Sequence, residues 1–352
     1  MKRKHWIDIA RGISIILIVY GHSVVIGNKI YMYLYSFNVP VFFFISGLTF
    51  CNNGKLDNYG FDDRPFLNFV DKTIKKLIYP YFIWGGISIL IYNFMARITI
   101  VSLGYKKEIY TLKQCFWGLF YGNVRNGYMD WNRPLWFLPC IVIVEVIVFL
   151  LCKIGKKYGC MKFILNASMV ISINWIFIMS FLKKNQKLSL PWELETSISM
   201  LSFFIIAVVL RNNEKIRRSY KKIRENNKII AICFISIVVI LNSWVAIYNG
   251  YIDVSTDLFE NPMLFLICSN MGILTVCVSA IIIESNLWLE YIGRNSMTIL
   301  VMHKFPVMIF RLLENKLKID NNNFCAFIVC VITIAVCLIL GRLKIVKKMV
   351  SL

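Results

Sequence analysis

Long apolar runs, separated by short polar segments, recur along the whole chain. Each run has about the 20 residues that an α-helix needs to cross a bilayer. The pattern therefore predicts an all-α, polytopic integral membrane protein with about ten transmembrane helices. The spans are expected near residues 7–27, 31–51, 75–96, 134–152, 161–181, 194–210, 228–248, 262–283, 291–311 and 324–342. An even number of crossings places both termini on the same side of the membrane.

The polar segments between these runs are too short to fold by themselves, so residues 1–352 are expected to form a single membrane domain. The composition agrees, because 58% of the residues are hydrophobic and 15% are aromatic, which excludes a soluble globular protein. The first run is too long for the apolar core of a signal peptide and lacks a small-residue cleavage site.

The net charge of +21 comes from bases that lie mainly in the short loops. This distribution follows the positive-inside rule, so no nucleic-acid partner is expected. Lysine and arginine are concentrated in the segments on the same side of the membrane as the N-terminus. The loop at 249–261, on the other side, has three acids and no base. The basic loop at 97–133 is the exception to this pattern. Both termini are therefore expected to be cytoplasmic, in a multi-pass protein of the cell membrane.

The first run contains Asp8, Arg11 and His22. An ionisable residue within a membrane helix costs roughly 2.5 kcal/mol or more, which makes such residues functional candidates. Their spacing places all three near one stripe of a helix, with His22 about 16 Å from Arg11 along the axis. An imidazole at this depth can act as a general base on an alcohol or as a nucleophile. A buried, hydrogen-bonded structural histidine is the alternative.

Further candidates lie in the second and the ninth span. His303 is a second imidazole within an apolar run, and here too a structural role is the alternative. Pro40 is expected to kink the second span and free a backbone carbonyl. Ser46, followed by Gly47, offers a small polar surface to a ligand or to another helix.

Three lysines, Lys72, Lys75 and Lys76, precede the third span on its predicted cytoplasmic side. Such lysines usually anchor a span according to the positive-inside rule. They are equally suited to bind the phosphates of a bulky cytosolic molecule. The sequence alone leaves both interpretations open.

The loop at 97–133 is the longest connection and is rich in tyrosine, tryptophan, asparagine and glycine. It ends at Arg133, and Trp136 follows at the start of the next span. Aromatic rings beside polar amides suit sugar binding, and long loops over a membrane domain often cover a binding site. An interfacial aromatic belt explains the same composition.

The eleven cysteines are scattered, mostly through apolar segments, and form no Cys-x-x-Cys pair. Small buried side chains are their expected role, so neither disulfides nor a metal site is predicted.

Five motifs follow one another along the chain: Asp8-Ile-Ala-Arg11-Gly12 with Gly21-His22, Phe43-Phe44-Ile45-Ser46-Gly47, the basic stretch from Lys72 to Tyr81, Pro134-Leu-Trp136-Phe-Leu138, and Gly293-Arg294-Asn295-Ser296 with His303. In this order they resemble the acyltransferase family 3 of membrane proteins over the whole membrane domain. The fucose 4-O-acetylase-like branch, whose members modify surface and capsular glycans, is the most similar. One position departs from the family pattern: this chain has Thr73 and Lys76 where the family typically has two arginines. Lysine cannot form the bidentate contact that arginine makes with a phosphate.

The resemblance implies O-acyl transfer, with acetyl from cytosolic acetyl-CoA as the expected acyl group. The implied acceptor is a sugar hydroxyl of a cell-surface glycan or of its lipid-linked precursor, in the plasma membrane of a bacterium. His22 is the implied catalytic residue, either as the base for the acceptor hydroxyl or as a transient acyl carrier.

The resemblance also divides the remaining candidates into two groups. The implied acyl-donor site comprises Arg11, Lys72, Lys75, Lys76 and Ser46. Arg133, Trp136 and His303 are implied to shape or orient the acceptor side, and Asp8 is expected to pair with Arg11 three residues later.

Two other classes of protein share these features. A transporter or flippase of a small polar molecule or glycan precursor also needs an intramembrane arginine and histidine. A membrane receptor or scaffold with an inert polar seam is the third class. The sequence leaves the oligomeric state open.

Overall fold

The computed structural model describes residues 5–50, 65–103, 110–125, 127, 129–182, 188–211, 223, 228–320 and 322–350. Most of them are helical, in α1 (His5–Ser23), α2 (Lys29–Tyr35), α3 (Asn38–Thr49), α4 (Phe66–Thr73), α5 (Tyr79–Leu103), α6 (Leu112–Tyr121), α7 (Phe137–Lys157), α8 (Met161–Leu182), α9 (Leu194–Arg211), α11 (Lys228–Asn249), α12 (Pro262–Ile283), α13 (Leu287–Arg294), α14 (Ser296–Met302), α15 (Lys304–Leu317), α16 (Asn323–Leu340) and α17 (Lys344–Val350). A π-helical turn, Ile74–Ile78, joins α4 to α5, and 3-10 helices occupy Asp130–Trp136, Pro191–Glu193 and Val254–Thr256. The described strands are β1 (Ile252–Asp253) and β2 (Leu258–Phe259), which pair antiparallel with Ile252 opposite Phe259.

The all-α, polytopic architecture is confirmed. Within the described ranges, eight helical segments are long and apolar enough to cross a membrane, and nine if the bent pair α14–α15 is one span. The first predicted span, α1, is not among them, because its polar side chains lower its mean hydropathy.

The interruption expected of Pro40 in the second span is confirmed. Pro40 has no N–H to donate to the carbonyl of Ser36, four residues earlier, and the chain breaks at residues 36–37, between α2 and α3. The freed Ser36 carbonyl accepts instead from the Ser269 hydroxyl of α12 at 2.8 Å. The single span expected at 291–311 is also interrupted, since α14 and α15 meet at an angle of 45°. Pro306 cannot donate an N–H to the carbonyl four residues earlier, which accounts for a break at this place.

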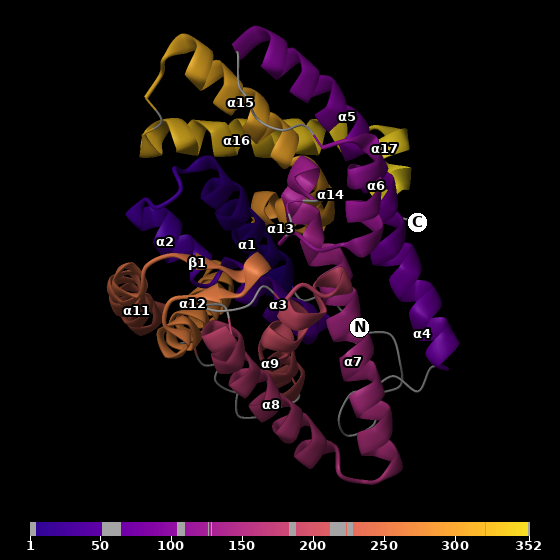
Figure 1. Cartoon of the computed structure of the whole chain (residues 1–352). Helices are drawn as coiled ribbons and strands as arrows, with labels where there is room; N and C mark the ends of the chain where they lie inside the picture. The colour runs from indigo at the N-terminus through magenta and orange to yellow at the C-terminus, as the bar shows by residue number, and fades with distance from the viewer. Residues whose placement is uncertain are drawn as a thin grey trace.

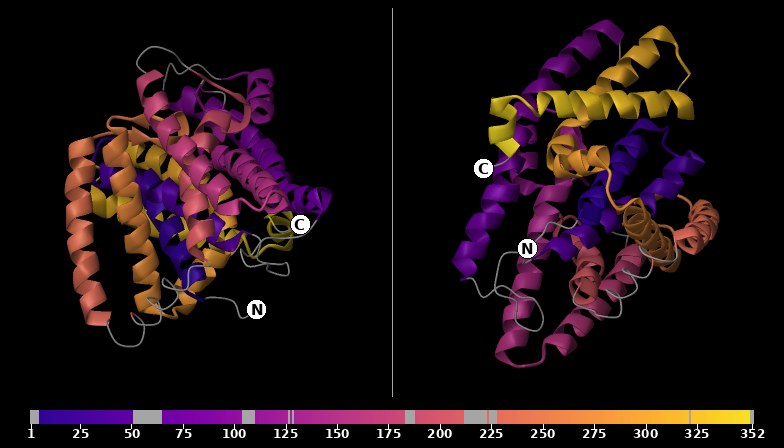
Figure 2. Two further views of the ribbon diagram at one scale, coloured as in Figure 1. Left: turned by 90° about the horizontal axis from the view of Figure 1, so that it is seen from below. Right: turned by 180° about the vertical axis from the view of Figure 1, so that it is seen from behind.

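Helix α1 lies at the centre of the molecule, surrounded by α3, α12, α13 and α16 (Figure 1). The pair α11 and α12 runs side by side along one edge, as Figure 2 shows in the view from below. The outward face of α11 is largely exposed and apolar, as expected of a helix that faces lipid. The helix with the costly polar residues is therefore enclosed by other helices, as such residues require.

Small residues set the distances between these helices. A Cβ atom on Gly293 would overlap the carbonyl oxygen of Asp8, and one on Gly12 would overlap the carbonyl oxygen of Leu289. The α1–α13 contact is thus a close backbone approach, of the kind that glycine permits in membrane helix pairs. Gly47 makes a similar approach, from α3 to the backbone of α9 at Phe204, so helix packing accounts for the glycine after Ser46.

Gly293→Val is expected to lower the free energy of unfolding by about 1–3 kcal/mol, because α1 and α13 must move apart to accommodate the side chain. Thermal unfolding of the purified protein in nanodiscs would measure this loss. Gly86→Ala in α5 is the matched control, since a Cβ atom there meets nothing within 4 Å. Equal stability of the two variants would contradict the close α1–α13 contact.

The two ends of the described chain meet at α13. The His5 side chain lies 2.9 Å from Glu290, and Arg342 donates to the hydroxyl of Tyr291 at 3.4 Å. The prediction that both termini lie on one side is consistent with these contacts. The assignment of that side to the cytoplasm stays a prediction.

Candidate functional site

A cavity of about 600 Å³ opens at the His22 end of α1. Its walls come from segments far apart in the chain: the end of α1, α2, the start of α3, the 3-10 helix at 130–136, the β1 hairpin and α15. The polar lining residues include His22, Tyr35, Asn38, Arg133, Asp253, Ser255, Lys304 and Arg311, and much of the remaining wall is apolar. An apolar pocket with a few converging polar groups is the usual form of a small-molecule site.

His22 is half-buried in this wall and is held from α2. Its Nδ1 atom lies 3.1 Å from the hydroxyl of Tyr35. Gly21 leaves room for this contact, because a Cβ atom on Gly21 would lie only 3.1 Å from the tyrosine ring. The imidazole is therefore oriented by a hydrogen bond while it still borders the cavity.

A second imidazole lies behind His22. The ring centroids of His22 and His303 are 5.1 Å apart, at an interplanar angle of 39°. His303 is fully buried at the break between α14 and α15. The two histidines, which are 281 positions apart in the sequence, thus belong to one site.

Arg133 and Trp136 also lie in this wall, and their assignment to the acceptor side stays a prediction. Arg133 donates through Nη2 to Asp253 at 2.7 Å and to the Ser255 hydroxyl at 3.1 Å. Asp253 also accepts from the backbone N–H and the hydroxyl of Ser255, so the hairpin holds this carboxylate in place. These contacts fix the 3-10 helix to the hairpin across the mouth of the cavity.

Three tyrosines form an aromatic stack at the same wall. The rings of Tyr31 and Tyr35 lie 3.9 Å apart, and the ring of Tyr251 lies 5.8 Å from Tyr31 and nearly parallel to it. Tyrosine combines an apolar ring with a hydroxyl, a combination suited to the faces and hydroxyls of a sugar. The aromatic surface predicted for the 97–133 loop is thus supplied here by α2 and the hairpin.

The residues assigned to the acyl donor lie elsewhere. Arg11 donates to the Thr49 hydroxyl of α3 at 2.7 Å, and Ser46 is half-buried on the same helix. Asp8 lies 3.4 Å from the Arg294 Nε atom of α13, and the Asp8–Arg11 pair stays a prediction. Along α1, Arg11 and His22 are separated by about 16 Å.

The three lysines of the predicted donor site, Lys72, Lys75 and Lys76, are exposed. Lys75 pairs with Asp71 at 2.8 Å, and Lys76 lies 3.8 Å from Glu145. Both belong to the π-helical turn, and Lys72 lies just before it in α4. A π-helical turn often marks a functional site, and here it carries two consecutive lysines at the start of the third span.

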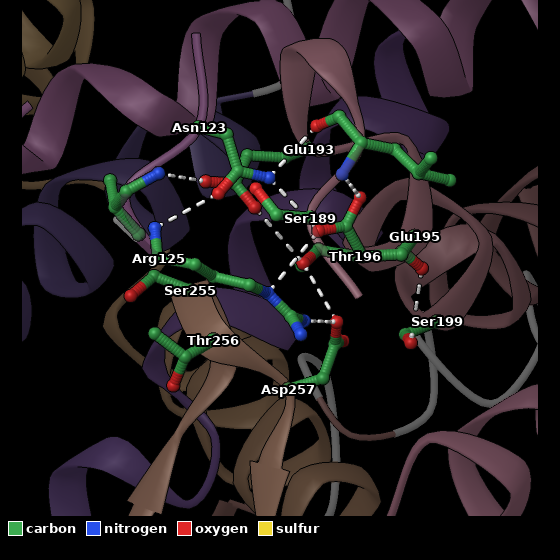
Figure 3. A network of polar contacts seen from close by, with 12 residues as sticks. Asn123, Arg125, Ser189, Glu193, Glu195, Thr196, Ser199, Ser255, Thr256 and Asp257 are labelled. Carbon is green, nitrogen blue, oxygen red and sulfur yellow. Dashed lines mark hydrogen bonds and ion pairs between the residues drawn. The ribbon is translucent and has the colours of Figure 1, made fainter. Parts of the chain in front are cut away.

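A buried polar network joins the segment at 123–125, the start of α9 and the hairpin at 252–259 (Figure 3). Arg125 lies between Asp257 and Glu195, with its Nε atom 3.2 Å from Glu195, and both carboxylates are fully buried. Glu193 accepts from the backbone N–H of Val124 at 2.7 Å, and Thr196 donates to Asp257 at 3.0 Å. The backbone at Glu193 and Asp257 is left-handed, a conformation that other contacts must hold in a non-glycine residue.

Sequence reasoning did not identify Tyr35, Asp253 or this network. One sequence signal pointed to the ion pairs of Asp253 and Asp257. These acids lie in the loop at 249–261, which was predicted on the same side of the membrane as the arginine-containing loop at 97–133. Their pairing partners lie more than a hundred positions away, so no local pattern could show the contacts.

A family model described as an acyltransferase domain matches residues 4–342 of the chain. No curated protein and no solved structure matches it. The matched range includes both imidazoles, the hairpin and the whole α1–α13 contact.

Proposed function

The chain belongs to the acyltransferase family 3 of membrane proteins and is a membrane acyltransferase. From this premise, we propose that it transfers an acetyl group from cytosolic acetyl-CoA to a sugar hydroxyl. The acceptor belongs to a cell-surface glycan or its lipid-linked precursor, as in the fucose 4-O-acetylase-like branch. The membrane is the plasma membrane of a bacterium. The observation that carries the proposal is the cavity in which His22 meets an aromatic and polar wall.

His22 supplies the reactive nitrogen. As a base, it takes the proton of the acceptor hydroxyl while the oxygen attacks the thioester carbonyl, and it returns that proton to the sulfur of the departing CoA. As an acyl carrier, it attacks the carbonyl itself and passes the acyl group to the acceptor. The half-buried position beside the cavity supports both routes.

The acceptor occupies the cavity, with a sugar ring against the tyrosine stack and Trp136. Arg133 and Asp253 offer a donor and an acceptor of hydrogen bonds at the mouth, which suits a polyhydroxylated ligand. The apolar part of the lining suits the lipid end of a lipid-linked saccharide.

The acyl donor binds from the opposite end of α1. Arg11 and the lysines Lys72, Lys75 and Lys76 attract the phosphates of CoA, and Ser46 lies on the way to His22. CoA is long enough to bring its thioester towards His22 while its phosphates stay near Arg11.

Incubation of the purified protein in nanodiscs with acetyl-labelled acetyl-CoA and a panel of bacterial glycans tests the proposal. Transfer of label to a saccharide, with release of CoA, is the expected result. CoA-independent movement of the saccharide across the bilayer, with no transfer to any acceptor, would instead support the transporter hypothesis.

Arg11→Ala is expected to weaken binding of CoA about 10- to 150-fold, because a charged hydrogen bond contributes about 1.5–3 kcal/mol. Calorimetric titration with CoA at two salt concentrations measures the change, and binding to the unmodified protein should weaken as salt increases. Lys162→Ala, an exposed lysine at the start of α8, is the control and should bind as the unmodified protein does. Unchanged binding by Arg11→Ala would remove Arg11 from the donor site.

A further inference from the structure

His303 is held in one tautomer by the backbone of its own helix. Its Nδ1 atom lies 3.0 Å from the carbonyl oxygen of Ile299 and 2.9 Å from that of Leu300. Both carbonyl oxygens only accept hydrogen bonds, so Nδ1 must carry the hydrogen. In the neutral ring, Nε2 then carries a lone pair.

This Nε2 atom is buried and has no hydrogen-bond partner in the described part of the chain. An unpartnered buried acceptor is costly inside a membrane protein and calls for an explanation. His303 is not among the residues that line the cavity, so a ligand in the cavity does not supply the missing donor. The polar ring that packs against His303 is His22, at 5.1 Å between centroids.

Among the residues that the structure describes, no carboxylate is the missing partner of His303. The charged side chains at the cavity are Arg133, Lys304, Arg311 and Asp253, and Asp253 is already bound to Arg133 and Ser255. Within the described residues, the hydrogen bond of His22 is the one to Tyr35, at Nδ1. Tyr35 lines the cavity, so the Nδ1 edge of His22 faces the ligand side.

We propose that His303 is a positioning residue for acyl transfer: its Nε2, which has no partner in this structure, accepts a hydrogen bond from Nε2–H of His22 once the two packed rings turn towards one another, and this bond leaves the lone pair of His22 on Nδ1. The hydrogen bonds then run in one direction, from the Tyr35 hydroxyl through His22 and His303 to the carbonyl oxygens of α14. This inference rests on the proposed function, in which His22 carries the chemistry.

The assignment determines which nitrogen reacts. The acceptor hydroxyl takes the place of the Tyr35 hydroxyl at Nδ1 of His22. Its O–H bond breaks as its oxygen bonds to the thioester carbon, the new N–H bond forms at Nδ1, and the ring becomes an imidazolium. The Nε2–H group of His22 stays hydrogen-bonded to Nε2 of His303. When the thioester carbon releases CoA, the Nδ1 proton passes to the thiolate sulfur, and the neutral ring is restored. His303 thus performs for His22 the orienting task that a carboxylate performs in a catalytic triad.

Nitrogen-15 NMR of the imidazole rings tests the tautomers directly, because the chain has only three histidines, His5, His22 and His303. The protein is labelled at histidine and measured in nanodiscs without substrate. Two rings should show a single neutral tautomer, Nδ1–H for His303 and Nε2–H for His22. A His22 ring that carries its hydrogen on Nδ1 would overturn the proposal.

Two variants of His303 connect the tautomer to activity. His303→Leu removes the acceptor, so the His22 signal should become a mixture of tautomers and kcat should fall about 10- to 100-fold with little change in KM. His303→Gln keeps an oxygen acceptor at similar reach and should recover most of kcat.

Unchanged kcat and an unchanged His22 signal in His303→Leu would leave His303 as a helix-packing residue and refute the proposal. Size-exclusion profiles identify a variant that does not fold, and the wild-type spectrum decides the question if His303→Leu is lost. A wild-type protein that transfers no acyl group would refute the proposed function, while the tautomer measurement still stands on its own.

Discussion

His22→Ala is expected to lower acyl transfer by about 10²- to 10⁴-fold, the usual contribution of a general base. The half-buried His22 imidazole borders the cavity and is oriented by Tyr35, and alanine leaves no nitrogen there to accept a proton or an acyl group. Transfer of label from acetyl-CoA to the glycan, measured at saturating donor, gives the size of the loss.

His5→Ala is the matched control, because it removes a histidine from the other end of the same helix. His5 contacts Glu290 and is largely exposed, with 62% of its side chain accessible. Its activity should match that of the unmodified protein. Equal activities of His22→Ala and the unmodified protein would sink the catalytic assignment.

Arg125→Met is expected to lower the free energy of unfolding by about 3–5 kcal/mol, because removal of one partner leaves buried carboxylates without their counter-charge. Asp257 and Glu195 are fully buried, and 6% of the Arg125 side chain is exposed. Methionine keeps much of the arginine's volume, so the loss reports the charge and its hydrogen bonds. Thermal or denaturant unfolding in nanodiscs measures it.

Lys228→Met tests the same change at an exposed pair. Lys228 and Glu284 are 46% and 35% exposed, and an ion pair of this kind contributes about 0–1 kcal/mol. If both variants unfold alike, the network around Arg125 does not stabilise the fold as described. Arg125→Met should also lower acyl transfer, because the same hairpin carries Asp253 at the cavity.

The spans and several candidate residues could be predicted because they depend on local properties. Hydrophobic runs of bilayer length are visible in any window of the sequence. Asp8, Arg11 and His22 stood out because a polar residue in such a run is costly. The break before Pro40 could be predicted as well, because proline cannot donate to the carbonyl four residues earlier. The break at 303 was not predicted, although Pro306 carries the same signal.

The partners of His22 could not be predicted from the sequence. Tyr35 and His303 reach it through the packing of α2 and of the α14–α15 bend against α1, which no spacing along the chain encodes. The same holds for Arg133 and Asp253, which are 120 positions apart. Individual candidates were therefore found, whereas their grouping into one site needed the fold.

The histidines at the cavity and the polar residues at its mouth come from different kinds of element. His22 and His303 belong to buried helices, while Arg133 and Asp253 belong to connecting segments joined by their own ion pairs. The 3-10 helix at 130–136 and the hairpin at 252–259 could thus be exchanged together, as one cassette, between related enzymes. Such a graft would also need to carry Arg125, the partner of Asp257 in the hairpin, and it offers a route to change the acyl acceptor while the membrane helices stay untouched.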